Sequence, residues 1–256
     1  MNREITIIGA GKMGLSLAEG LVRKGFVKRD NLILTNSKTH NNKEAAEKAD
    51  VVIFAVKPQI MKGVLQEVSE VKDGSLAMSM AAGVTLDSIS RELSGGEKTE
   101  IVRVMSNLAA QVEEGMSVWT VNRNVTEENK KVTQEVLGSV GKECEVDNED
   151  MIDKATAISG SGPAYFFYIV ELLTEMGMQF GFSEEISRLL AEQTFIGAAK
   201  VLAEAHQDAS TLRRAVTSKG GTTEAAFKQF EREHLDKRFM KGVDRAYRRA
   251  KELGKM

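Results

Sequence analysis

The 256-residue sequence is poor in the residues that build disulfide bonds and metal sites. Cys144 is its only cysteine, so the chain can form neither an intramolecular disulfide nor a cysteine-based metal site. The three histidines, His40, His206 and His234, form no cluster with the spacing of metal ligands. We therefore expect no metal in this protein.

Excess charge and long apolar runs are also missing. The net charge of −2 gives no reason to expect binding to nucleic acid or to an acidic membrane surface. No apolar run is long enough to span a bilayer, and the first expected strand starts too close to Met1 to leave room for a targeting peptide. We expect a cytoplasmic protein with one large domain or two ordinary ones, and with neither nucleic acid nor membrane as a partner.

Against 2 prolines stand 22 glycines, and three of them form the strongest motif of the chain. The apolar, β-branched segment 5–8 predicts a buried strand, and apolar residues with helical spacing begin at Leu15. Between them lies a G-x-G-x-x-G sequence, made of Gly9, Ala10, Gly11, Lys12, Met13 and Gly14. A strand, a tight turn and a helix in this order favour a dinucleotide site, with the pyrophosphate at the helix N-terminus. The alternative is a plain glycine-rich turn.

The segment 31–35 predicts a second strand, whose end meets the adenosine ribose in this fold. An acidic residue there would bind the ribose 2′-hydroxyl and select NAD. The chain has Asn36, Ser37 and Lys38 instead, an amide, a hydroxyl and a cation that suit a 2′-phosphate. We therefore predict NADPH as the cofactor, with NADH possible, against the alternative of a polar turn with a solvated lysine.

Further strands are expected at 50–56, 75–81, 101–105, 116–121 and 143–146, with a helix over 125–140. The connection from 36 to 50 has room for one short helix, over 43–48 with Asn42 as its N-cap, so this half is abbreviated. The pattern predicts an α/β fold with a Rossmann-like, doubly wound, mostly parallel sheet. Ligands bind at the carboxyl ends of such strands, which adds these cofactor candidates: Ala55, Val56, Lys57, Pro58, Ala81, Ala82, Gly83 and Asn107.

After residue 150 the strand pattern stops, and helices are expected over 152–178, 184–205, 211–215, 224–230 and 235–253. We predict a cofactor domain over 1–149 and an all-α domain over 150–256. Segment 159–165 interrupts the first helix, with Ser161 as a candidate N-cap. Segment 217–223 is either a nest of free N–H groups for an anion or a turn with a threonine N-cap. The surplus of apolar residues in the first two helices favours a subunit interface.

With both halves placed, the sequence resembles the pyrroline-5-carboxylate reductase family over nearly its whole length. The motifs that carry the resemblance are Ile8–Gly14, Ala55–Pro58, Ala81–Val84, Arg103–Met105, Ala157–Tyr165, Gln193–Lys200 and Val216–Thr223. The Ser-Gly-Ser-Gly-Pro-Ala-Tyr stretch and the Thr-Ser-x-Gly-Gly-Thr-Thr loop, in this order behind a Rossmann half, are highly specific to that family.

The resemblance implies hydride transfer from NAD(P)H to the imine carbon of 1-pyrroline-5-carboxylate, which gives L-proline. Asn36, Ser37 and Asn42 match residues near the adenosine ribose, and Val56, Lys57 and Ala82 match residues along the cofactor. The substrate candidates that it implies are Ser218, Gly220, Gly221, Thr222, Thr223 and Glu149. In the family the helical domain interlocks two chains, so each site uses the cofactor of one chain and the loop of the other, and pentamers of dimers occur.

Thr223 matches the hydroxyl that is usually nominated to hydrogen-bond the imine nitrogen, and it is our catalytic candidate. An imine is basic and can arrive protonated, so its reduction needs an oriented carboxylate and one hydrogen bond rather than a strong acid. We therefore expect Thr223 to be an orienting donor and not a general acid, because a neutral hydroxyl is a poor acid.

Three departures from the family pattern bear on activity. Where the family usually has Met-Pro-Asn-Thr-Pro, this chain has Met-Ser-Asn-Leu-Ala at 105–109, which puts the stiffness of that loop in question. Lys219 replaces a proline of the substrate loop and adds an N–H and a charge. The segment after Asn36 is shorter than in most members, which weakens the expected NADP preference.

Two rival functions stay open. One is another small NADP-dependent reductase, such as a 3-hydroxy acid dehydrogenase, in which a lysine on a helix of the second domain acts as the acid. Lys200 has a matching place, and it can equally be a surface residue. The other rival is a non-catalytic, regulatory cofactor-binding protein, suggested by the substitutions at Ser106, Leu108, Ala109 and Lys219.

Overall fold

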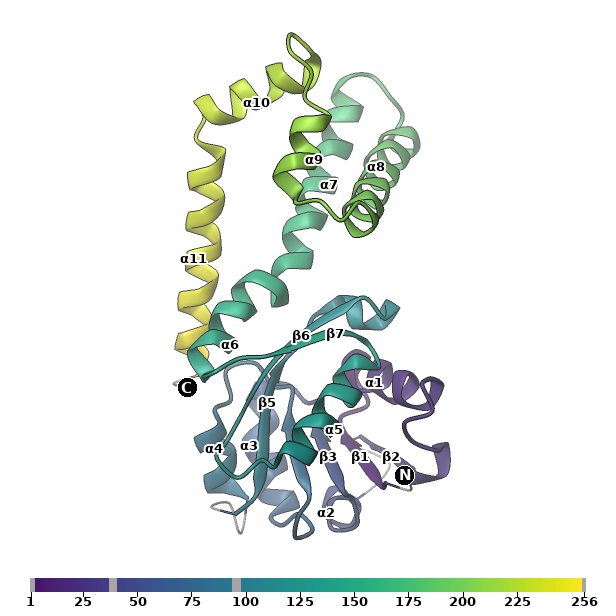
Figure 1. Cartoon of the computed structure of the whole chain (residues 1–256), viewed down its shortest axis with the longest axis vertical. Coiled ribbons are helices and arrows are strands. Elements are labelled where there is room, and N and C mark those ends of the chain that lie inside the picture. The colour runs from purple at the N-terminus through teal and green to yellow at the C-terminus, as the bar shows by residue number, and fades with distance from the viewer. Residues whose placement is uncertain (1–2, 37–40, 94–97, 255–256) are drawn as a thin grey trace. The chain divides into compact units, whose positions relative to one another are not determined.

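Strands and helices alternate through the first half of the computed structural model, which describes residues 3–36, 41–93 and 98–254 (Figure 1). Within this described part, seven strands form one sheet in the order β2-β1-β3-β4-β5-β6-β7. The strands are β1 (Ile5–Ile8), β2 (Leu32–Thr35), β3 (Val51–Phe54), β4 (Leu76–Ser79), β5 (Glu100–Met105), β6 (Gly115–Val121) and β7 (Gly141–Glu145). All neighbours pair in parallel except β5 with β6. The predicted mostly parallel sheet is therefore confirmed.

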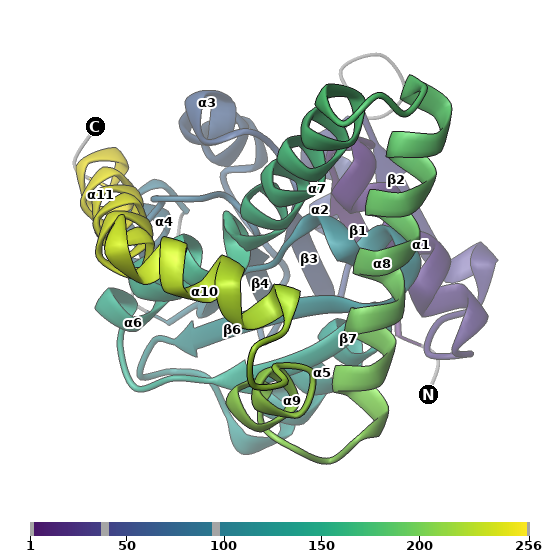
Figure 2. The same ribbon diagram turned by 90° about the horizontal axis from the view of Figure 1, so that it is seen from above.

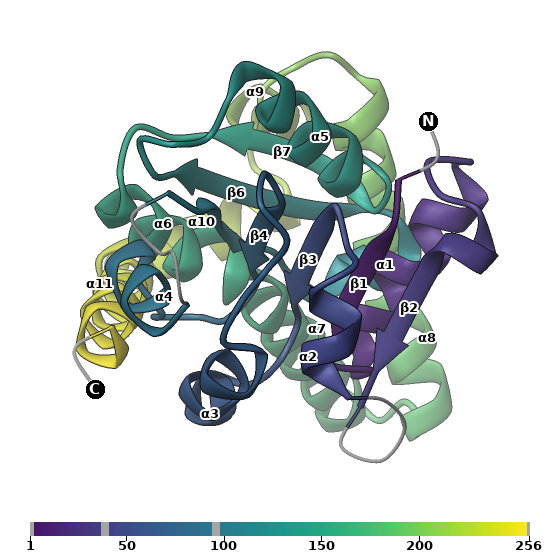
Figure 3. The same ribbon diagram turned by 90° about the horizontal axis from the view of Figure 1, so that it is seen from below.

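Helices cover both faces of this sheet (Figure 3). They are α1 (Lys12–Arg23), α2 (Asn42–Ala46), α3 (Pro58–Val68), α4 (Leu86–Glu92) and α5 (Glu127–Gly138). Val51 and Ile53 of β3 belong to the core under α1 and α5, whereas Val52 and Phe54 belong to the core under α2, α3 and α4. Because successive strand residues point to opposite faces, a strand buried on both faces is apolar at every position.

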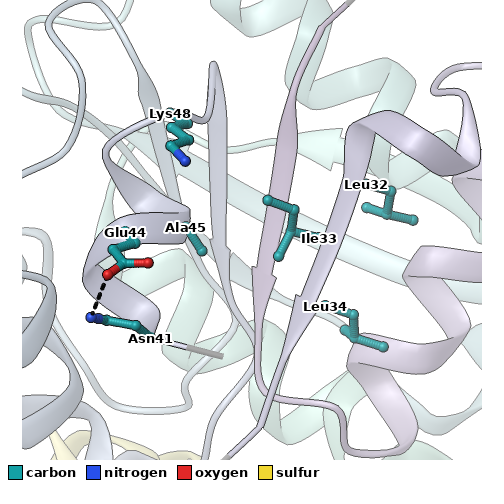
Figure 4. Close-up of a pocket in the computed structure, with 7 residues that line it drawn as sticks. All are labelled: Leu32, Ile33, Leu34, Asn41, Glu44, Ala45 and Lys48. Atoms are coloured by element: carbon teal, nitrogen blue, oxygen red, sulfur yellow. Dashed lines mark hydrogen bonds between the residues drawn. The ribbon is translucent and has the colours of Figure 1, made fainter. Parts of the chain in front are cut away.

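The connection from β2 to β3 holds only the five-residue helix α2, as the sequence predicted for an abbreviated half. So short a helix leaves part of the sheet face uncovered, and a pocket of about 370 Å³ lies there (Figure 4). Its lining residues are Leu32, Ile33, Leu34, Asn41, Glu44, Ala45 and Lys48. The pocket follows the open edge of the sheet and contains none of the cofactor candidates.

The predicted N-cap of α2 is wrong by one residue. Asn41 caps the helix, because its side chain accepts a hydrogen bond from the Lys43 N–H at 3.0 Å. Asn42 is already the first helical residue, and its side chain bonds to other elements instead. Two asparagines in a row offer the same cap chemistry, so the sequence alone could not separate them.

Contacts divide the chain into two compact units, Met1–Ser161 with Arg245–Met256, and Gly162–Asp244. The first unit therefore includes α6 (Glu149–Ala155), a π-helical turn (Thr156–Gly160) and the end of α11 (Leu235–Leu253). This division by contacts differs from the predicted domain boundary at 149/150, which stays a prediction. The predicted N-cap at Ser161 is wrong, because that residue has helical backbone angles and its N–H bonds to the Thr156 carbonyl.

The second unit consists of helices, as predicted: α7 (Gly162–Gln179), α8 (Glu184–Glu204), α9 (Ala209–Ala215), α10 (Thr222–Arg232) and the beginning of α11. Helices α7 and α8 pack side by side (Figure 2). They approach closely where Gly177 faces Ser187, since a Cβ on Gly177 would lie 2.7 Å from the Ser187 hydroxyl. Among the helices of the described residues, none is long and apolar enough to cross a membrane.

Candidate active site

The glycine-rich turn after β1 has a different use for each of its three glycines. Gly9 has a φ of +116°, and a Cβ there would lie 2.6 Å from the carbonyl oxygen of Ala55. A Cβ on Gly14 would collide with the carbonyl of Gly9, so this glycine lets α1 begin tight against the turn. A Cβ on Gly11 would meet no atom within 4 Å. The fold itself needs Gly9 and Gly14, whereas Gly11 keeps open a space that the fold does not fill.

That open space lies at the N-terminus of α1. The first backbone bond of the helix runs from the Leu15 N–H to the Gly11 carbonyl at 2.9 Å, so the amides of Lys12, Met13 and Gly14 have no partner in the helix. Gly11 is the N-cap and has no side chain to accept from them, and the first turn contains no acidic residue. These amides and the positive end of the helix dipole fit the pyrophosphate of a dinucleotide.

The end of β2 joins this turn directly, since the Gly9 N–H donates to the Thr35 carbonyl at 3.1 Å. The Thr35 hydroxyl donates to the Asn42 amide oxygen at 2.6 Å, and the Asn42 amide nitrogen donates to Glu67 at 3.0 Å. Asn42 is thereby fixed at the end of β2, beside the exposed Asn36. The predicted residues Ser37 and Lys38 lie outside the described residues.

The end of β3 brings the next group of candidates to the same edge of the sheet. The Ala55 N–H donates to the Ile8 carbonyl at 2.9 Å, which holds the two strand ends level. Lys57 is the N-cap of α3 and Pro58 its first residue, a position that suits proline because no N–H is needed there. Ala55 and Val56 are half-buried there and the Lys57 side chain is exposed.

The candidates after β4 have a second neighbour that the sequence did not indicate. Ala81 is buried and its N–H donates to the Ser79 hydroxyl at 3.3 Å. Gly83 has a φ of +78°, and a Cβ there would lie 3.0 Å from Leu253 in the last turn of α11. Packing against the end of the chain therefore already accounts for a glycine at this position.

Asn107 closes the site at the end of β5. Its side-chain oxygen accepts from the N–H groups of Ala109 at 3.2 Å and Met116 at 3.3 Å, and its amide nitrogen donates to the Ser159 carbonyl at 3.1 Å. The segment Leu108–Val112 forms a 3-10 helix capped by this residue. Hydrogen bonds thus hold a loop that lacks the prolines usual in the family.

A buried ion-pair network lies next to these strand ends. Arg103, in the middle of β5, is 2% exposed and donates to Glu149 at 3.0 Å and to Asp153 at 2.5 Å. The same oxygen of Glu149 accepts from the Leu86 N–H at 2.9 Å, at the start of α4. An arginine inside an apolar strand is a signal in the sequence for such a network, because a buried cation needs acidic partners, and the predicted site residues do not include Arg103.

The loop before α10 shows which of its N–H groups are in use. Gly220 has a φ of +77°, its N–H donates to the Glu224 carboxylate at 3.0 Å, and the Gly221 N–H donates to the Ser218 carbonyl at 3.0 Å. The hydrogen bonds from Gly220 and Lys228 hold the pKa of Glu224 below its ordinary value. Gly221 is the N-cap, so the alternative of a threonine N-cap is wrong, and Thr222 and Thr223 occupy the first turn with their amides toward the helix start.

The structure thus brings the described cofactor candidates together along one edge of the sheet in the first unit. The loop candidates from Ser218 to Thr223 gather at the start of α10 in the second unit. Glu149 lies in the first unit, with Arg103 and Leu86 as its partners. Within the part of the chain that the structure describes, no group of three or more His, Cys, Asp or Glu residues is placed to hold a metal ion.

Two family models match the chain. Residues 149–253 match a family described as pyrroline-5-carboxylate reductase dimerisation, and residues 4–83 match one described as NADP oxidoreductase, coenzyme F420-dependent. Among curated relatives, a pyrroline-5-carboxylate reductase of Methanosarcina acetivorans is 34% identical over 99% of both chains. One of Arabidopsis thaliana is 35% identical over 98% of this chain and 95% of its own.

Solved structures agree with the sequence relatives. A pyrroline-5-carboxylate reductase from Coxiella burnetii superposes with a TM-score of 0.92 at 37% identity and covers 100% of both chains. The Plasmodium falciparum enzyme, solved with NADP bound, gives a TM-score of 0.87 at 30% identity and covers 99% of this chain and 98% of its own.

Proposed function

We propose that the chain catalyses the reaction of the family to which it belongs, the pyrroline-5-carboxylate reductases. In this reaction 1-pyrroline-5-carboxylate is reduced to L-proline, the last step of proline synthesis. The observation that carries the proposal is the turn after β1, where Gly9 and Gly14 serve the fold and Gly11 leaves room for a pyrophosphate. The cofactor supplies a hydride from C4 of its nicotinamide to the imine carbon.

The cofactor is held by residues of the first unit. The amides of Lys12, Met13 and Gly14 receive the pyrophosphate at the start of α1. Asn42 is fixed by hydrogen bonds to Thr35 and Glu67, and we expect it to reach the ribose of the adenosine half. Further along the sheet edge, the residues that line the cofactor are Ala10, Ala55, Val56, Lys57, Pro58, Ala81, Ala82, Gly83 and Asn107.

The choice of NADPH over NADH belongs to the residues after β2. Asn36, Ser37 and Lys38 offer no carboxylate that would repel a 2′-phosphate, and Lys38 adds a cation. The NADP-bound relative and the match to an NADP oxidoreductase family support this preference. NADH stays a possible second donor.

The loop before α10 receives the substrate carboxylate. The Gly220 N–H is bonded to Glu224 of α10 and the Gly221 N–H to Ser218 of the loop. We therefore assign the carboxylate to the amides of Thr222 and Thr223 and to nearby hydroxyls, with Ser218 among them. The Thr223 hydroxyl then orients the imine nitrogen, and the substrate brings its own proton.

Glu149 has a different place in this proposal from the other substrate candidates. Its side chain accepts hydrogen bonds from the Arg103 guanidinium and the Leu86 N–H, both inside the first unit. We therefore propose that Glu149 positions β5 and the start of α4, and that any effect on the substrate is transmitted through them.

The active form that we propose is at least a homodimer. The dimerisation family matched over 149–253 supports association of like chains through the helices. Each site then combines the cofactor edge of one chain, meaning the carboxyl ends of its parallel strands, with the loop 217–223 of its partner. Five dimers can join into a decamer, as in other family members. A cytoplasmic location completes the proposal.

The rival functions have less support. Lys200 is an exposed residue of α8, and among the described residues it has no ion pair or hydrogen bond that would mark it as a positioned acid. A non-catalytic protein was suggested by the altered 106–109 loop, but Asn107 holds this loop with three hydrogen bonds. Both observations favour the reductase.

A spectrophotometric assay tests the proposed reaction. Purified protein is mixed with NADPH and 1-pyrroline-5-carboxylate, loss of the reduced nicotinamide absorbance is followed, and NADH is tested in parallel. We expect oxidation that requires the imine and falls at least about tenfold in Thr223→Ala, with Thr217→Ala in the same loop as a control. If the folded protein binds NADPH but 1-pyrroline-5-carboxylate causes no oxidation of NADPH, the proposal would be overturned.

A further inference from the structure

The last two turns of α11 are fastened to the first unit by one carboxylate. Asp150, in the first turn of α6, accepts hydrogen bonds from the Tyr247 hydroxyl at 2.7 Å and from the Lys251 ammonium at 3.0 Å. Lys154 completes the group at 2.8 Å on the other oxygen. These three hydrogen bonds hold the pKa of Asp150 well below its usual range, and the bond from Lys154 has the largest effect. The carboxylate is therefore charged at neutral pH. We refer to Asp150, Tyr247 and Lys251 as the clasp.

The turn of α11 that is held by the clasp packs against the loop between β4 and α4. A Cβ on Gly83 would lie 3.0 Å from Leu253 and 3.1 Å from the nitrogen of Gly254, and Gly254 in turn lies against the Gly83 carbonyl. Gly83 has a φ of +78°, in the left-handed region that favours glycine. Leu253 and Gly254 therefore pack against the loop between β4 and α4.

The same loop is fixed at its other end by the neighbour of Asp150. Glu149 accepts from the Leu86 N–H at 2.9 Å, where α4 begins. Two adjacent acidic residues of α6 thus hold the segment 83–86 from both sides, one directly and one through α11. All of these residues belong to the first compact unit.

We propose that Tyr247 and Lys251 are positioning residues for the cofactor. Through the last turn of α11 they hold the 81–83 loop in place at the carboxyl ends of the parallel strands, where the cofactor is proposed to bind. The inference rests on the proposed cofactor site, in which Ala82 and Gly83 line that edge. It assigns a role in cofactor binding to the end of a helix that the sequence places with the dimerisation region. No residue of the clasp touches the cofactor in this assignment.

The test compares two double variants in the same two turns of α11. Tyr247→Phe with Lys251→Met removes both donors to Asp150. Arg245→Met with Arg249→Met removes two cations that bond to Glu252 instead, at 3.3 and 2.9 Å, and serves as the matched control. For each full-length protein, the Kd for NADPH is measured by fluorescence titration, the KM for the imine at saturating NADPH, and the melting temperature.

We expect the clasp variant to raise the Kd for NADPH by about threefold to tenfold, with the KM for the imine within about twofold of the parent, because only the cofactor loop moves. The control variant should leave both constants unchanged. Deletion of residues 253–256, which keeps the clasp but removes the contact with Gly83, should raise the Kd for NADPH to the same extent.

An unchanged Kd in the clasp variant or in the deletion, or an equal rise in the control, would overturn the inference and leave the clasp a purely structural feature. A parent protein that binds NADPH and fails to reduce the imine would overturn the proposed reaction alone. A parent protein that does not bind NADPH would overturn both.

Discussion

In the first unit, strands β1, β3 and β4 are buried along their whole length, whereas in the second unit the long helices α7 and α8 bury almost nothing. Across residues 162–244, all of which the structure describes, only Gly162, Ser187 and Ala191 are buried. Phe166 and Phe167 are more than half exposed. Exposed apolar surface of this extent marks an interaction site.

The first unit completes its own hydrophobic core, whereas the second unit leaves a large apolar surface exposed. The first unit closes both faces of its sheet with helices from its own chain. The second unit matches a dimerisation family and exposes the apolar residues that a dimer would cover. Substitutions should therefore act on folding in the first unit and on association in the second.

The largest effect is expected where the second unit is open. Leu173→Asp with Leu190→Asp places two charges on half-exposed leucines of α7 and α8, and the dimer Kd should rise by at least about 10,000-fold. Ile60→Asp, at a similarly exposed residue of α3, is the control and should leave the association unchanged. Light scattering after size-exclusion chromatography measures both. If the dimer Kd is unchanged by the double substitution, the exposed surface of α7 and α8 is not the interface between the chains.

The next effect concerns the closed core of the first unit. Arg103→Met leaves Glu149 and Asp153 without their buried partner and should lower the free energy of unfolding by about 3–5 kcal/mol. Arg91→Met removes an exposed pair with Asp87 on α4 and should cost no more than about 0.5 kcal/mol. Denaturant unfolding of the two variants decides. Equal losses would show that burial does not set the strength of these pairs.

Within the first unit, two glycines separate folding from binding. Gly14→Ala forces a Cβ into the Gly9 carbonyl and should lower stability by about 1–3 kcal/mol together with NADPH affinity. Gly11→Ala enters open space, so the melting temperature should stay unchanged while the Kd for NADPH rises by about tenfold or more. Calorimetry and fluorescence titration give the two readouts. A Gly11 variant with unaltered affinity would remove the cofactor from this turn.

The smallest effect is a pH dependence in the second unit. Hydrogen bonds from Ser210 and Thr211 lower the pKa of Asp208, the N-cap of α9, to about 2. A depressed pKa contributes stability above the ordinary value of 3.8, and this contribution is lost as the pH falls toward 2. Amide chemical shifts of α9 should follow this change in the parent protein. Asp208→Asn caps the helix without titrating, and persistence of the change there would assign it to another group.

The sheet, its order of elements and the helical second half could be predicted from the sequence, because apolar periodicity reports burial directly. The turn after β1 was predictable for the same kind of reason, since each glycine there answers a local steric need. The abbreviated β2–β3 connection followed from its length alone.

What the sequence could not provide were contacts between distant residues. Gly83 reads as part of a cofactor loop, and only the structure shows Leu253 against it. Asn107 reads as a cofactor residue, and its three hydrogen bonds reach as far as Ser159. The sequence predicts a break in the helix at 159–165, whereas the structure has a π-helical turn before α7, because glycine and serine are typical of both. Such details depend on tertiary neighbours that no local pattern encodes.

The most direct test of the account is a mixed dimer. Gly11→Ala weakens NADPH binding and Thr223→Ala removes the orienting hydroxyl of the loop, so each homodimer should keep no more than about a fifth of the parent activity at an NADPH concentration near the parent KM. If each site combines one chain's cofactor edge with its partner's loop, heterodimers purified through two different tags contain one intact site of two. They should therefore show about half of the parent activity. If the heterodimer is no more active than the Gly11→Ala and Thr223→Ala homodimers, the shared site is contradicted, because each site would then belong to one chain alone.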